Sequence, residues 1–225
     1  MNRAIWLTSF HIKEVFRLSV KTPRNIEVFP NLEWLSIEGP MPPEFWEMVS
    51  RIRLRILECD RVVRSLPLPD RLEGLVASGL CANITLPSNP LSRLRVVSLV
   101  QVRPHELEIF GQSPLECFIT KSVNVDLKYL KKCPLRIVSI GNPKCGDIRP
   151  LHGKPISVFQ SHERNTTKLV GVADINWPRL KYFYGNTDHS IVHNHMSHLT
   201  HGVLKSITET ELDKLYAKAR HTYPS

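Results

Sequence analysis

The sequence lacks the short motifs that mark common catalytic and nucleotide-binding folds. It contains no GxSxG, no P-loop and no GxGxxG after an expected strand, and its 10 glycines are scattered. No apolar run approaches the roughly 18–20 residues of a membrane helix. The first residues also lack the apolar stretch and cleavage site of a signal peptide. These absences favour a protein that is not an enzyme, has no membrane span and is intracellular, in the cytoplasm or nucleus.

Cysteine pairs are missing as well. The 5 cysteines are odd in number and form no CxxC motif. A disulfide framework or a cysteine-based zinc site would need paired cysteines at short spacing. The cysteine usage therefore fits a reducing compartment, and Cys59 is expected to be a small buried side chain.

Positive charge exceeds negative charge along the chain. There are 30 lysines and arginines against 21 acidic residues, which gives a net charge of +9. Such an excess suits an acidic partner such as nucleic acid, or simply a solvated surface. The hydrophobic content of 42% is that of a folded protein.

A six-residue pattern recurs, with apolar residues at its first and fourth positions and, in five of eight copies, at its sixth. The copies are 32–37, 54–59, 72–77, 94–99, 115–120, 135–140, 156–161 and 180–185, and their starts are 18 to 24 residues apart. A period in the low twenties is typical of one strand plus one return segment, stacked as a solenoid. An earlier strand is expected within Val15–Val20.

Side chains alternate between the two sides of a strand, so the fourth and sixth positions face the core and the third and fifth face outward. The third positions form a first outward column: Arg17, Trp34, Ile56, Gly74, Val96, Cys117, Ile137, Val158 and Tyr182. The fifth positions form a second column: Ser19, Ser36, Glu58, Val76, Ser98, Ile119, Ser139, Gln160 and Tyr184. The first column predicts an apolar stripe that faces solvent.

The second position of the pattern alternates in charge. Six consecutive copies carry Glu33, Arg55, Glu73, Arg95, Glu116 and Arg136. In a parallel sheet these residues would be neighbours about 4.8 Å apart, where opposite charges attract. The alternation therefore supports the same register.

The LxxLxL pattern at this spacing resembles that of leucine-rich repeat proteins. The resemblance implies an α/β solenoid with a parallel sheet on its concave face and irregular or short-helical segments on its convex side. The Asn or Cys that the family places three residues after the strand motif is absent. Short helices are expected at Pro43–Ser50 and Val125–Lys132, and a last strand at Leu204–Ile207.

Three regions follow from this interpretation. Residues 1–28 form an N-terminal cap with the earlier strand, residues 29–207 form the repeats, and residues 208–225 form a C-terminal capping helix and tail. Thr208 and Glu211 match a capping box, so the helix is expected over residues 209–220.

An exposed apolar stripe usually marks an interaction surface, and aromatic side chains often dominate its affinity. The predicted function is therefore a scaffold or module that binds a protein partner on the concave face. The candidate contact residues are Trp34, Ile56, Glu58, Val96, Ile137, Val158, Gln160, Tyr182 and Tyr184.

Two alternatives stay open. One is a structural component that binds RNA through basic residues on the convex side: Arg51, Arg53, Arg61, Arg64, Lys128, Lys131 and Lys132. The other is a substrate-recognition adaptor of a ubiquitin ligase. The lengths of the repeats resemble the short class found in such adaptors, although no F-box precedes them.

Histidines gather near the C-terminus. His193, His195, His198 and His201 have a spacing that could present imidazoles to a metal ion. Solvated turn residues are the simpler interpretation, because no HExxH motif or cysteine pair accompanies them. No cofactor is expected.

Overall fold

The computed structural model describes residues 17–21, 25–39, 41–59, 68–69, 71–77, 91–141, 143–161, 169–172, 174 and 176–184. Several predictions fall outside these residues. They are the cap before Arg17, the basic residues Arg61 and Arg64, the histidines from His193 to His201, the strand Leu204–Ile207 and the helix over 209–220.

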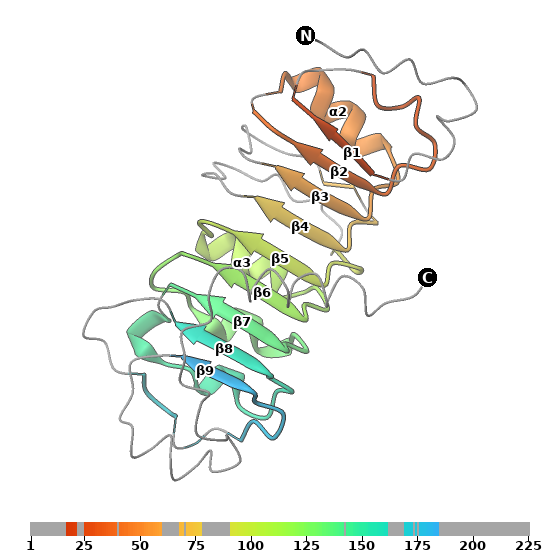
Figure 1. Ribbon diagram of the computed structural model, residues 1–225. Coiled ribbons are helices and arrows are strands. Elements are labelled where there is room, and N and C mark those ends of the chain that lie inside the picture. Colours follow the sequence, from red (N-terminus) through yellow and green to blue (C-terminus); the bar gives the residue numbers. More distant parts are fainter. Residues whose placement is uncertain are drawn as a thin grey trace.

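The described residues build one parallel sheet whose nine strands follow sequence order (Figure 1). The strands are β1 (Arg17–Val20), β2 (Trp34–Ile37), β3 (Ile56–Cys59), β4 (Gly74–Ala77), β5 (Val96–Leu99), β6 (Cys117–Thr120), β7 (Ile137–Ile140), β8 (Val158–Ser161) and β9 (Tyr182–Tyr184). Each expected pattern contains one of β2 to β9, and β1 lies within the earlier strand. The parallel arrangement is therefore confirmed.

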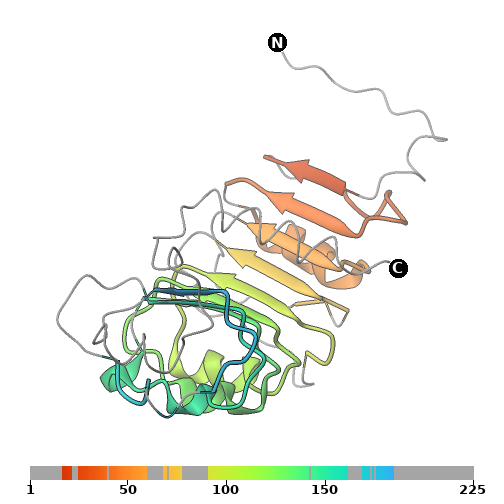
Figure 2. The ribbon, with the colours of Figure 1, turned by 60° about the horizontal axis from the view of Figure 1, so that its bottom comes forward.

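Within the described residues, five helical segments accompany the sheet: α2 (Pro43–Arg51), α3 (Pro104–Phe110) and the 3-10 helices η1 (Leu127–Lys132), η2 (Lys144–Gly146) and η3 (Arg149–Leu151). Figure 2 shows α3 and the following helices beneath one face of the sheet. The expected helices correspond to α2 and η1, whereas the sequence pattern did not predict α3, η2 or η3.

The core lies between this side of the sheet and the helices. Leu35, Val97 and Phe118 are inward strand residues with no exposed surface, and each belongs to the same cluster as Phe45 of α2 and Leu130 of η1. Because the fourth and sixth positions of the pattern point into this cluster, the predicted assignment of inward side chains is confirmed. Cys59, also inward, is 5% exposed as expected.

Aromatic rings complete the core at the β9 end. The ring of Phe159 lies 5.3 Å from that of Trp177 and 5.4 Å from that of Phe183, measured between centroids. The indole N–H of Trp177 donates to the carbonyl of Leu151 at 3.0 Å. These contacts join β8 and β9 to η3.

Hydroxyl groups tie neighbouring segments together where the strands end. Thr120 donates to the carbonyl of Val100 at 3.4 Å, and Ser161 donates to that of Gly141 at 3.3 Å. The amide of Val102 donates to the Ser122 hydroxyl at 2.6 Å. These bonds link each segment to the preceding one where its strand ends.

Candidate interaction surface on the outer face of the sheet

The side of the sheet opposite the core is called the outer face here, and it carries the two outward columns. Strand pairing places Trp34 beside Ile56, Val96 beside Cys117, and Ile137 beside Val158. The second column is in register in the same way, with Ser36 beside Glu58 and Ser139 beside Gln160. Both columns run from β1 to β9 as the repeat predicts.

Half-buried apolar side chains extend along much of the first column. They are Trp34, Ile56, Val96 and Ile137, and the second column adds Val76 and Ile119. Gly74 leaves a position without a side chain between Ile56 and Val96. The outer face therefore presents an apolar stripe to its surroundings from β2 to β7.

Other members of the columns are buried, although the repeat predicts exposure. Cys117 is 2%, Val158 1%, Ser139 0% and Gln160 4% exposed. Cys117 lies between Val96 and Ile137, and Ser139 lies between Ile119 and Gln160. Equivalent side chains on adjacent strands are only about 4.8 Å apart, so the larger neighbours enclose the small side chains of Cys117 and Ser139. The accessible part of the surface is thus shorter than expected.

Tyr182 is the last member of the first column, and Tyr184 is the last member of the second. Their backbones pair with Val158 and Gln160 of β8. The side chains of the two tyrosines lie outside what the structure describes, so the accessible surface is defined here by β2 to β7.

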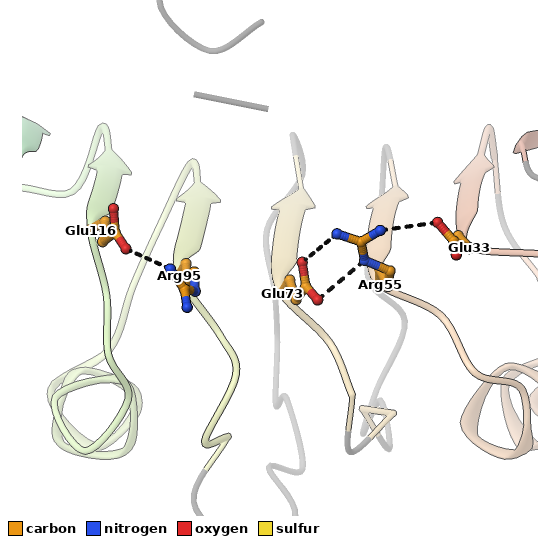
Figure 3. A network of polar contacts seen from close by, with 5 residues as sticks. All are labelled: Glu33, Arg55, Glu73, Arg95 and Glu116. Carbon is orange, nitrogen blue, oxygen red and sulfur yellow. Dashed lines mark hydrogen bonds and ion pairs between the residues drawn. The ribbon is translucent and has the colours of Figure 1, made fainter. Parts of the chain in front are cut away.

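The alternating charges stand side by side just before the strands, as Figure 3 shows. Arg55 contacts Glu33 at 3.2 Å and Glu73 at 3.0 Å. In the next pair, Arg95 contacts Glu116 at 2.9 Å, and Arg136 lies 3.6 Å from the same carboxylate. This row of charges borders one end of the outer face.

The backbone sets the spacing of this charge row. The amide of Arg55 donates to the carbonyl of Glu33 at 2.8 Å, and that of Glu116 donates to the carbonyl of Arg95 at 2.8 Å. The hydrogen bond that Arg55 donates to the Glu73 carboxylate raises the pKa of Arg55. Because the row is partly solvated, each pair contributes only about 0.2–1 kcal/mol. Its larger effect is to favour one register over others.

An ion pair marks the other end of the first strands. Lys21 lies 2.7 Å from the Glu38 carboxylate, and the hydroxyl of Ser19 donates to that carboxylate at 3.4 Å. The hydrogen bond from Lys21 lowers the pKa of Glu38. The acidic group is therefore held charged at neutral pH beside β1 and β2.

The predicted basic residues lie apart from the outer face. Arg51 ends α2, and Lys128, Lys131 and Lys132 belong to η1, on the helical side of the sheet. All four are exposed. Three further basic residues, which the sequence did not single out, follow η1 closely in the chain. Lys144 lies on η2, Arg149 lies on η3, and Lys154 comes just after η3. The density of lysines between 126 and 154 was the available signal.

No group of three or more potential metal ligands occurs within the described part of the chain. Of the helices that the structure describes, none is long and apolar enough to cross a membrane. The cysteines at 59, 117, 133 and 145 are free thiols.

Comparisons with protein-family models, curated proteins and solved structures find no match for this chain.

Proposed function

We propose that the chain is a divergent leucine-rich repeat solenoid that binds another protein on the outer face of its sheet. The proposal is supported by nine parallel strands in sequence order, with a buried leucine or isoleucine at the start of each repeat from residue 32 onward. Short helical segments on one side and an accessible strand face on the other suit such an architecture.

The apolar stripe is the observation that carries the proposed binding function. Trp34 and Ile56 stand in register on adjacent strands, Val96 follows in the same column beyond Gly74, and all three are only half-buried. The helices α2, α3, η1 and η3 contribute their buried residues to the opposite side. A row of apolar side chains left partly accessible across several strands is typical of an interaction surface.

A protein is the partner class that this surface suits best. Apolar and aromatic side chains dominate the buried centre of protein interfaces, while charged residues surround it. The stripe has that composition, with the charge row beside it along the starts of the strands and the Lys21–Glu38 pair just after β1 and β2. Nucleic acid would instead require cations along the same face.

The test compares two valine-to-glutamate variants. Val96→Glu places a charge in the stripe, whereas Val28→Glu makes the same change at a 46%-exposed residue in the turn before β2. Affinity capture with quantitative mass spectrometry should recover one set of proteins with the wild type and Val28→Glu. Val96→Glu should lose that set, with a Tm within a few degrees of the wild type. Equal capture by all three proteins would refute binding through this face.

A further inference from the structure

Lysines concentrate on the helical side of the molecule around η1, η2 and η3. Residues 126–154 contain seven basic and two acidic side chains, whereas residues 25–59 contain three basic and six acidic ones. Besides residues 1–24, which carry a net charge of +4, the stretch from 126 to 154 is therefore the main source of positive charge, with a net charge of +5. It lies away from the apolar stripe of the outer face.

Ion pairs and hydrogen bonds bring these lysines together in space. The ammonium groups of Lys128 and Lys144 lie 3.0 and 3.6 Å from the same carboxylate oxygen of Asp126. Two positive charges thus share one negative charge. The ammonium of Lys154 donates to the carbonyls of Lys131 and Cys133 at 2.6 and 2.7 Å, which places it beside the end of η1.

The crowding leaves an unbalanced positive field. Burial lowers the pKa of Lys154, and the nearby charge of Lys131 acts in the same direction. Lys131 and Lys132 are exposed and form no ion pair among the described residues. An anion placed beside Lys131 and Lys132 would therefore gain favourable interactions without first breaking an existing pair.

The apolar side chains of these helices are not available to a partner. Leu127, Leu130 and Leu151 are at most 2% exposed. A membrane-binding helix needs an accessible apolar face, and the centre of a protein interface is normally poor in lysine. The phosphate backbone of a nucleic acid requires only spaced cations.

We propose that the lysine surface formed by Lys128, Lys131, Lys132 and Lys144 binds the phosphate backbone of nucleic acid without reading its base sequence. Lysine suits this role because its ammonium acts as a point charge and does not need the fixed fork geometry of a base contact. The site is separate from the apolar stripe and does not depend on the function proposed for it.

The test uses fluorescence anisotropy with a labelled oligouridine of about 16 nucleotides. Binding should weaken steeply between about 50 and about 200 mM salt. The variant Lys131→Gln/Lys132→Gln should reduce the affinity roughly tenfold, and the slope of log affinity against log salt should become shallower by roughly 1.4. A thermal melt checks that these exposed substitutions leave the fold intact.

The matched control removes two positive charges elsewhere. Arg93→Gln/Lys121→Gln alters two exposed residues outside the lysine surface and should keep most of the affinity. A duplex of the same length and vesicles containing phosphatidylserine complete the comparison. The proposal is overturned if the wild type ignores RNA at low salt, if both double variants lose affinity equally, or if only vesicles are bound. Val96→Glu should still bind RNA, which separates this test from that of the outer face.

Discussion

At the scale of the residue, Thr120 and Ser161 differ from what the repeat predicts. They occupy inward positions where the pattern expects apolar side chains, and they are 1% and 4% exposed. Their hydroxyls bond to carbonyls of the preceding segment. The pattern could not predict these hydrogen bonds, because the partner of each hydroxyl lies about twenty residues away and becomes a neighbour only in the folded sheet.

Exposure was also harder to predict than orientation. The sequence correctly assigned Val96 and Cys117 to the outer face, yet Val96 is half-buried and Cys117 is 2% exposed. Orientation depends on the two-residue period of the strand, which a sequence displays directly. Exposure depends on the size of neighbouring side chains from other segments.

Three glycines provide a test at this scale. A Cβ at Gly111 would overlap the carbonyl oxygen of Tyr129, and one at Gly141 would overlap that of Lys121. A Cβ at Gly74 would lie no closer than 3.6 Å to its neighbours Ile56 and Val96. The first two sites have no room for a methyl group, and the third does.

We expect Gly111→Ala and Gly141→Ala each to lower the free energy of unfolding by about 1–3 kcal/mol, because backbone must shift to admit the methyl group. Gly74→Ala is the control and should leave the free energy of unfolding unchanged or slightly higher. Urea unfolding measures all three. Equal stability of the three variants would show that the close backbone approaches are not present.

At the scale of the element, the helices differed in how well the sequence predicted them. α2 begins at Pro43 and has apolar residues at helical spacing, so its bounds agree with the prediction within one residue. α3 has only seven residues, which is too short for a clear period, and its start depends on a 2.8 Å bond from the Arg103 amide to the Glu106 carboxylate. Short segments of this kind are fixed by local hydrogen bonds and neighbouring packing.

Asp126 precedes η1 and stabilises it in two ways. Its carboxylate accepts a hydrogen bond from the Lys128 amide at 3.2 Å and pairs with the ammonium groups of Lys128 and Lys144. Burial acts to raise the pKa of Asp126, but the bonds and charge of Lys128 prevail and lower it. A lowered pKa means that the charged form stabilises the folded state above the unfolded pKa, and this contribution is lost as pH falls through the folded value.

We expect Asp126→Ala to reduce the free energy of unfolding by about 1 kcal/mol at neutral pH, since an N-cap is lost. The difference from the wild type should shrink as the pH falls below about 4. Asp126→Asn retains the acceptor and should lose less. Urea unfolding at several pH values measures this. A difference that grows on acidification would contradict the role given to the carboxylate.

At the scale of the whole molecule, the order of the strands followed from the sequence alone. The leading leucines Leu32, Leu94 and Leu135 begin equivalent segments, and the alternating charges before the strands identified the same neighbours independently. Equivalent residues must lie side by side when identical units stack, so the register could be predicted without coordinates. The arrangement of the helical side could not be predicted in this way, because its segments differ in length and type from one repeat to the next.

Both faces of the sheet depend on the alternation of side chains between its two sides. Two neighbouring residues on β5 show this alternation. Val97 is fully buried in the core, and Val96 is half-buried on the outer face. The same substitution at the two positions changes composition and strand propensity equally, so only the side of the sheet differs. This pair tests the register directly, because a slip of one residue would exchange the two faces.

The decisive measurement is urea unfolding of Val96→Asp and Val97→Asp. We expect Val97→Asp to lose about 3–5 kcal/mol or fail to fold, because a charge would enter the core. Val96→Asp should lose only about 1 kcal/mol, mainly through its lower strand propensity. Equal losses, or a greater loss at Val96, would contradict the assignment of the leucine-lined side to the interior and of the apolar stripe to the surface.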